Sequence, residues 1–160
     1  MSMIGNMLAV SQAELDALYQ DPDTVPAYLY DTRSDESVDL DKAWHAIHFV
    51  LTGEEYGGEG PLAQAVLGGV PIGDEDVGYG PARGLSAADV KAVAAALEQV
   101  TESDLRAKFD ADALTEAEIY PQIWDEGDVA LDYVLDNFLE MRRFYQDAAT
   151  RDMAVLLFIN

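Results

Sequence analysis

Apolar residues recur at helical spacing in several segments of the 160-residue chain. Ser11 and Glu14 have the spacing of a capping box, so we expect a helix from Ser11 to about Tyr19. Residues 41–52 have the pattern of a second helix, which Gly53 would end in a left-handed conformation. Further amphipathic or capped helices are expected over 62–67, 86–97, 101–109 and 128–149.

Two apolar runs indicate strands near the two ends of the chain. The run from Ile4 to Val10 is short and β-compatible, and residues 153–159 form a continuous apolar run typical of a strand buried on both faces. We therefore expect the second run to lie at the centre of the sheet. Shorter strands are expected around 70–72 and 79–83.

These elements predict an α/β fold of the mixed α+β kind. We expect a single compact layered domain over residues 1–160, with a small mixed sheet that contains the N- and C-terminal strands and is packed by several amphipathic helices. Length and composition agree, because 160 residues with 49% hydrophobic content suffice for one core.

The negative net charge of the chain excludes some classes of binding partner. The chain has 31 acidic against 9 basic residues, a formal net charge of -22, which repels nucleic acid and anionic membranes. We expect neither as a partner. A basic protein or a small ligand fits better, although the charge has the simpler alternative role of keeping the protein soluble.

The absence of cysteine excludes disulfides and thiolate metal sites and is compatible with a reducing compartment. The start of the chain lacks the pattern of a signal peptide, and no apolar run approaches the roughly 20 residues that span a bilayer. The expected location is the cytoplasm.

The densest group of possible metal ligands lies on the helix predicted over 41–52. Asp41, His45 and His48 share one face there, which makes them weak candidates for a metal site. The alternative interpretation is that His48, between Trp44 and Leu51, is a buried neutral histidine with a backbone or carboxylate partner, while His45 lies at the rim. We expect no bound cofactor.

Other candidate residues adjoin glycines or a proline. Arg83 follows the glycines of a loop, and Glu118 and Tyr120 precede Pro121. No nucleophile elbow, phosphate loop or dinucleotide-binding pattern is present. The predicted pocket residues are Asp41, Trp44, His48, Arg83, Glu118 and Tyr120.

Four segments together resemble one known family, the YfbM-like bacterial proteins, a domain of unknown function. They are MIGN near the start, DKAWHAIHFVLTG at 41–53, PLAQAVLG at 61–68 and EIYP at 118–121. The resemblance spans nearly the whole chain and implies a compact layered α/β domain of bacterial origin, without an activity or cofactor. It includes His48 in the family pattern and leaves His45 as a variable position.

Two functions follow from these observations. The preferred one is a non-enzymatic interaction or ligand-binding domain whose surface is formed by the glycine-rich loops at 53–60 and 73–84; an inhibitor of a basic enzyme is one form of it. The alternative is a metal-dependent hydrolase that uses Asp41, His48 and Glu118.

Overall fold

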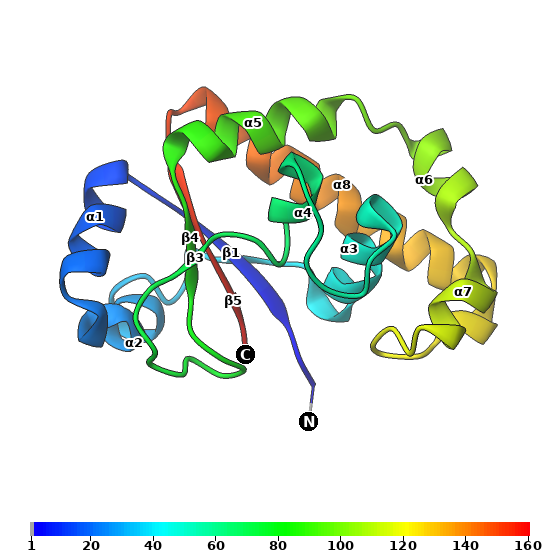
Figure 1. Ribbon diagram of the computed structural model, residues 1–160, viewed down its shortest axis with the longest axis horizontal. Helices are drawn as coiled ribbons and strands as arrows, with labels where there is room; N and C mark the ends of the chain where they lie inside the picture. Colours follow the sequence, from blue (N-terminus) through cyan, green and yellow to red (C-terminus); the bar gives the residue numbers. More distant parts are fainter. Residues whose placement is uncertain (1) are drawn as a thin grey trace.

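A five-stranded sheet runs through the middle of the computed structural model, which describes residues 2–160 (Figure 1). The strands lie in the order β2-β1-β5-β4-β3, and every pairing is antiparallel. Their bounds are β1 Gly5–Val10, β2 Val38–Asp39, β3 Val70–Pro71, β4 Arg83–Leu85 and β5 Ala154–Ile159.

The central position predicted for the C-terminal strand is confirmed. In β5, Leu156 and Phe158 enter a core cluster on one face of the sheet, while Val155 and Leu157 enter a larger cluster on the other face. Residues of a strand alternate between the two faces. Both faces of the sheet are covered, so the strand is apolar at every position.

The helices form a layer on each side of this sheet (Figure 1). One side holds α1 (Gln12–Gln20) and a series of short turns, η1 (Pro22–Thr24), α2 (Val25–Ala27) and η2 (Tyr28–Thr32). The other side holds η3 (Asp41–Ala43), α3 (Trp44–Thr52), α4 (Pro61–Gln64), α5 (Ala87–Glu98) and α8 (Asp128–Thr150). Beyond the sheet, α6 (Glu102–Lys108), α7 (Ala111–Glu116) and η4 (Trp124–Glu126) complete that end of the molecule.

The predicted helix ends are confirmed where a cap defined them. Ser11 accepts a hydrogen bond from the Glu14 amide, and the Glu14 carboxylate accepts one from the Ser11 amide. Gly53 ends α3 with a φ of 76°, the left-handed conformation that glycine adopts without strain. These local signals act within one turn of helix, so they can be recognised in the sequence.

One feature of the predicted sheet is wrong: it is antiparallel throughout instead of mixed. The reason is the connection between β4 and β5. Helices α5 and α8 pack side by side in opposite directions, so the chain returns to the sheet at the end from which it left (Figure 1). The returning strand β5 must then run opposite to β4.

A close approach between β1 and α3 supplies a test of the packing. A Cβ atom added at Gly5 would lie 2.6 Å from the Trp44 Cβ, which the backbone holds in place. We expect Gly5→Ala to lower the free energy of unfolding by about 1–3 kcal/mol, measured by urea denaturation. Gly84→Ala is the control: its nearest contacts are the far ends of Leu15 and Tyr19, which can move. Equal losses in the two variants would contradict this account.

Candidate functional site

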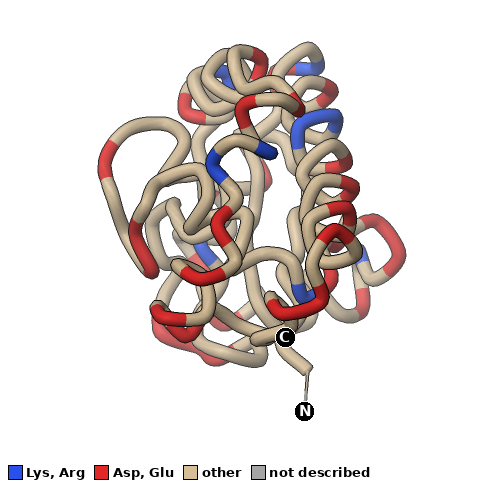
Figure 2. Tube along the Cα trace, turned by 90° about the vertical axis from the view of Figure 1, so that its right-hand side faces the viewer, with Lys and Arg blue, Asp and Glu red and all other residues tan. Residues whose placement is uncertain are grey.

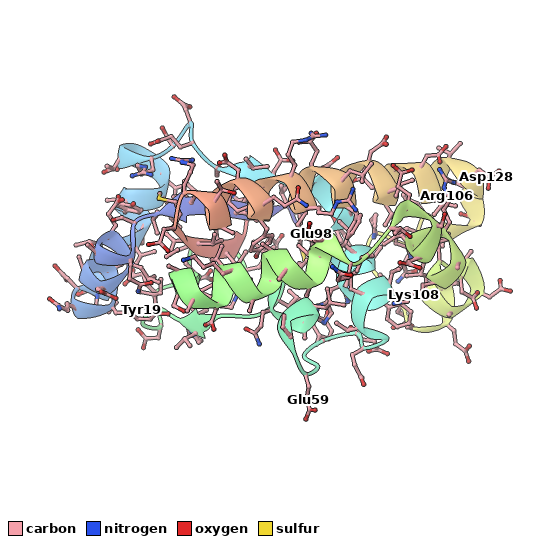
Figure 3. All side chains as sticks on the ribbon, turned by 90° about the horizontal axis from the view of Figure 1, so that it is seen from above. Tyr19, Glu59, Glu98, Arg106, Lys108 and Asp128 are labelled. Carbon is pink, nitrogen blue, oxygen red and sulfur yellow. The ribbon has the colours of Figure 1, made fainter. Side chains whose placement is uncertain are left out.

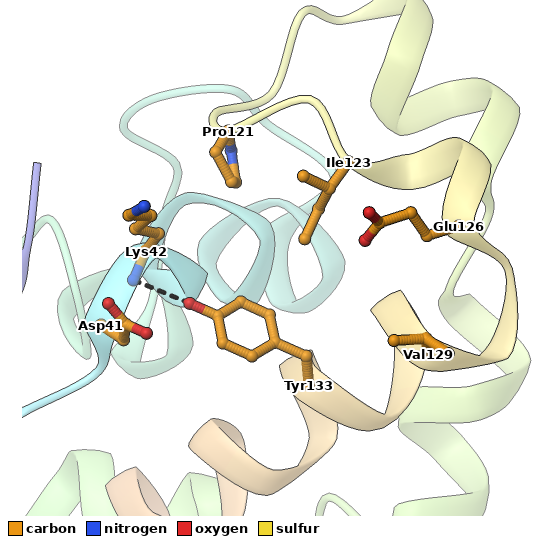
Figure 4. Close-up of a pocket in the computed structure, with 7 residues that line it drawn as sticks. All are labelled: Asp41, Lys42, Pro121, Ile123, Glu126, Val129 and Tyr133. Atoms are coloured by element: carbon orange, nitrogen blue, oxygen red, sulfur yellow. Dashed lines mark hydrogen bonds between the residues drawn. The ribbon is translucent and has the colours of Figure 1, made fainter. Parts of the chain in front are cut away.

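An open groove of about 520 Å³ lies between η3 and the start of α8 (Figure 4). Three segments that are far apart in the sequence form its walls: the start of the α3 region, the turn that leads into η4, and the first two turns of α8. The residues that line it are Asp41, Lys42, Pro121, Ile123, Glu126, Val129 and Tyr133.

A hydrogen bond joins two walls of the groove. The Lys42 amide donates to the Tyr133 hydroxyl at 2.9 Å, so the first turn of the α3 region is attached to α8 (Figure 4). Burial raises the pKa of Tyr133 to about 12, and the negative charge of Asp41 adds to the rise. The phenol is therefore neutral at physiological pH.

The groove combines an apolar surface with acidic groups. Val129 is 71% exposed, and Pro121 and Ile123 are half-buried. Figure 4 shows the Asp41 carboxylate beside Tyr133 and the Glu126 carboxylate on the opposite side, near Ile123. An exposed valine on the wall of a concave site is a group that a ligand can cover.

Backbone strain is concentrated around this groove. Asp41, Glu118 and Gln122 have φ values of 48°, 55° and 64°, a left-handed conformation that side chains other than glycine seldom adopt. In residues 2–160 only Asp152 shares it among the residues that are not glycine. Such strain is typical of functional sites, because the surrounding structure must impose it.

Acidic residues dominate the surroundings of the groove. Besides its own Asp41 and Glu126, the exposed residues Glu118, Asp125 and Asp128 belong to the segments that form it. Figure 2 shows acidic residues in every part of the chain and few basic ones. Arg106 of α6 is close to the start of α8 in Figure 3 and forms an ion pair with Asp132, with 3.5 Å between the guanidinium nitrogen and the carboxylate oxygen.

His45 lies directly behind the Pro121 wall and has a partner on each ring nitrogen. Its Nδ1 accepts a hydrogen bond from the Tyr120 amide at 3.0 Å, so Nε2 carries the proton and donates to the Glu55 carbonyl, also at 3.0 Å. The side chain is 3% exposed, so its predicted place at the rim is wrong. Burial lowers the pKa of His45, although Glu55 acts in the opposite direction.

His48 is fully buried, as predicted, but neither ring nitrogen has a hydrogen-bond partner within residues 2–160. The predicted carboxylate partner is therefore wrong, and the backbone near Gly57 approaches the ring without completing a hydrogen bond. Burial lowers the pKa of His48, and neighbouring Arg83 and His45 add to the effect, while Glu54 and the backbone near Gly57 oppose it. The imidazole is neutral and inaccessible.

The other predicted pocket residues have different surroundings. Arg83 donates to the carbonyls of Val66 at 3.2 Å and Gly68 at 2.8 Å, a structural role at the end of the α4 region. The Trp44 indole donates to the Met3 carbonyl, and the Tyr120 hydroxyl accepts from the Met3 amide.

The six predicted residues thus divide into separate groups. Only Asp41 lines the groove. Trp44 and Tyr120 lie together behind it, with ring centroids 6.0 Å apart, and Glu118 is exposed on the adjoining turn.

A catalytic metal site finds no support. Within residues 2–160, no group of three or more His, Cys, Asp or Glu side chains is placed to hold a metal ion. Both nitrogens of His45 are occupied, and His48 is inaccessible. The hydrolase predicted from Asp41, His48 and Glu118 therefore has no structural basis here.

The two glycine-rich loops contact different parts of the fold. The first, 53–60, covers His45 through Glu55 and through Tyr56, whose ring centroid lies 4.9 Å from that of His45. In the second loop, the Tyr79 amide donates to the Ile159 carbonyl, beside the end of β5. We therefore take the groove, and not a surface shared by the two loops, as the main candidate for a binding site.

The groove residues missed by the sequence analysis are Lys42, Pro121, Ile123, Glu126, Val129 and Tyr133. One local signal was present, because Val129 and Tyr133 are four residues apart and share a face of α8. Nothing in that spacing shows which other segment faces them.

Fold and groove together define a layered α/β protein with an open acidic groove and an antiparallel sheet. None of the helices in the described part of the chain combines the length and apolar character needed to cross a bilayer. A family model described as a domain of unknown function, DUF1877, matches residues 1–158. The chain belongs to this family.

Two comparisons agree with this assignment. Protein YfbM from Escherichia coli strain K12 is 30% identical over 129 residues, which are 77% of this chain and 75% of that protein. The crystal structure of a protein of unknown function, YfbM from Escherichia coli, matches with a TM-score of 0.76 at 24% identity and covers 98% of this chain and 99% of that one. The YfbM-like resemblance and the fold class predicted from the sequence are thereby confirmed.

Proposed function

We propose that the protein is a non-enzymatic binding domain whose groove receives a basic segment of a protein partner. The observation that carries the proposal is the groove itself, which combines the exposed side chain of Val129 and the Tyr133 ring with the carboxylates of Asp41 and Glu126. An arginine next to an apolar residue fits this combination, since the guanidinium pairs with a carboxylate while the apolar side chain covers the valine.

Charge supports a basic partner over an acidic or neutral one. The net charge of -22 accelerates encounter with a basic protein at low salt, and the acidic residues around the groove give that attraction a local direction. Lys42 is the one basic residue that lines the groove. The volume of the groove also lies within the usual range of roughly 300–1,000 Å³ for ligand sites.

A short peptide tests this proposal directly. We expect acetyl-Leu-Arg-Leu-Arg-amide to bind at low salt, measured by calorimetry, and Asp41→Asn with Glu126→Gln to weaken it about tenfold, as two exposed ion pairs would. Asparagine tolerates the left-handed backbone of position 41. Glu59→Gln is the matched control, because Glu59 lies at the tip of loop 53–60 and points away from the protein in Figure 3.

Two outcomes would contradict the proposal: no binding by the native protein, or an equal loss of affinity in the Glu59→Gln control. Val129→Ser supplies a second test, because replacing the exposed valine side chain should weaken binding of the peptide without changing the charge of the protein. Amide chemical shifts in the NMR spectrum should move around Val129 and Tyr133 when peptide is added.

The biological form that we propose is an interaction in the cytoplasm, with inhibition of a basic enzyme as its most specific version. The cysteine-free composition is compatible with that compartment. A small cationic molecule could occupy the same groove, and competition between it and the peptide would separate these ligands.

A further inference from the structure

A single histidine connects loop 53–60 to the wall of the groove. His45 Nε2 donates to the carbonyl of Glu55 in the loop, and His45 Nδ1 accepts from the amide of Tyr120 in the turn. The next residue after Tyr120 is Pro121, which lines the groove. The imidazole is therefore attached to this wall through one backbone hydrogen bond.

The two hydrogen bonds respond differently to a proton. Protonation of imidazole makes both nitrogens donors. Nε2 then still donates to Glu55, but Nδ1 carries a hydrogen that faces the hydrogen of the Tyr120 amide. Acid thus breaks the bond on the groove side and leaves the bond on the loop side intact.

We infer that His45 makes the groove sensitive to acid: a proton on Nδ1 releases the Tyr120 amide, displaces Pro121 and weakens ligand binding. The inference rests on the proposed function, because it concerns regulation of the same groove. The 3% exposure of His45 means that the proton enters when loop 53–60 opens. All eight residues of that loop are exposed, and Gly53, Gly57, Gly58 and Gly60 have positive φ values that allow such a movement.

The groups around His45 favour its neutral form in the closed protein. From its own helix, the Trp44 ring stacks on it with centroids 5.0 Å apart, and His48 lies one turn further on. From the loop come the Tyr56 ring and Glu55, and from the turn comes the Tyr120 amide. Among these groups Glu55 favours the protonated form, first through the hydrogen bond to its backbone carbonyl and then through its carboxylate, and burial outweighs both, so the pKa of His45 lies below its ordinary value.

The first test uses the native protein without a ligand. Nitrogen-15 NMR would follow the His45 ring and the Tyr120 amide between about pH 7.5 and 5. We expect hydrogen exchange at Tyr120, corrected for its intrinsic pH dependence, to lose protection with the same midpoint as protonation of Nδ1. An unchanged Tyr120 amide after His45 has titrated would overturn the inference.

A pair of variants separates the two nitrogens. Asparagine at position 45 places an acceptor near Nδ1 that does not titrate, so His45→Asn should bind the Leu-Arg peptide with no pH dependence in this range. His45→Gln places its amide near Nε2 and leaves no acceptor for Tyr120, so it should bind weakly at every pH. The native protein should bind about fivefold more weakly at pH 5 than at pH 7.5, as expected for one lost hydrogen bond.

The arginines of the peptide stay charged throughout this pH range, and His45→Asn keeps the groove carboxylates, so any pH dependence of theirs would remain in that variant. Failure of the proposed function has a different signature: no peptide binding at any pH while Tyr120 still responds to His45. If the peptide binds equally at both pH values, or if His45→Asn keeps the native pH dependence, the inference is wrong.

Discussion

Trp124→Ala is expected to lower the free energy of unfolding by about 3–5 kcal/mol. The Trp124 side chain is 1% exposed, and its ring meets that of Phe109 edge-on with centroids 6.1 Å apart. Its indole nitrogen donates to the Ile119 carbonyl at 2.8 Å. Truncation would therefore remove a large apolar group, leave a cavity and remove one of the two hydrogen bonds to the Ile119 carbonyl, which also accepts from the Gln122 amide at 3.0 Å.

Phenylalanine at the same position separates these contributions. Trp124→Phe retains most of the packing but loses the indole hydrogen bond to Ile119, whose carbonyl keeps the bond from the Gln122 amide, so we expect a loss of about 1 kcal/mol. Urea denaturation followed by circular dichroism measures both variants. If alanine and phenylalanine destabilise the protein equally, packing around Trp124 is not the main contribution.

The second large effect is a loss of stability in mild acid caused by the two histidines. In the unfolded chain both have a pKa near 6.5, whereas burial lowers the pKa of each in the folded protein. Below about pH 6.5 the unfolded state therefore binds more protons than the folded state. The stabilisation is fully present above that pH and is lost as the pH falls through the folded pKa values.

The expected slope is up to about 1.4 kcal/mol per pH unit for each histidine, or roughly twice that for both, at pH values between the unfolded-state pKa near 6.5 and the lowered folded-state pKa values. Urea denaturation at several pH values would measure it. The double variant His45→Asn with His48→Leu is the control, since it retains all 31 acidic residues and so the same carboxylate repulsion. A native slope equal to that of the double variant would show that the histidines do not cause the effect.

His48→Leu also tests whether the unpartnered imidazole is unfavourable. Both of its buried nitrogens lack hydrogen-bond partners in the described structure. An apolar side chain of similar size removes the free-energy cost of burying them. We expect this single variant to be at least as stable as the native protein at neutral pH. A loss of several kcal/mol would mean that the imidazole has a partner in solution.

Much of the fold could be predicted because its signals are local or strongly periodic. The Ser11 cap and Gly53 defined the ends of two helices, and the unbroken apolar run before Asn160 predicted a central strand. The two-residue strand β3 lies where a short strand was expected, around 70–72, whereas β2 is too short for an alternating pattern to be recognised. Their pairing depends on neighbours far away in the sequence.

The site was harder to predict because its walls meet only in the folded protein. Asp41 was identified from its own helix, but Tyr133, which accepts a hydrogen bond from the neighbouring Lys42 amide, lies about 90 residues away, and only tertiary structure brings them together. His45 was misplaced for a related reason. The helical pattern shows one apolar face, whereas loop 53–60 and the turn at Tyr120 cover the face that the pattern leaves open.

The central pairing of β1 with β5 has a consequence for the synthesis of the protein. Asn6 and Asn160, whose side chains share a hydrogen bond, are 154 residues apart, so β1 emerges from the ribosome long before its partner exists. Until then the apolar β1 must be shielded by local contacts with α1 or by a chaperone, and contacts of such long range slow folding. The helical layers can assemble during translation, but the sheet closes last.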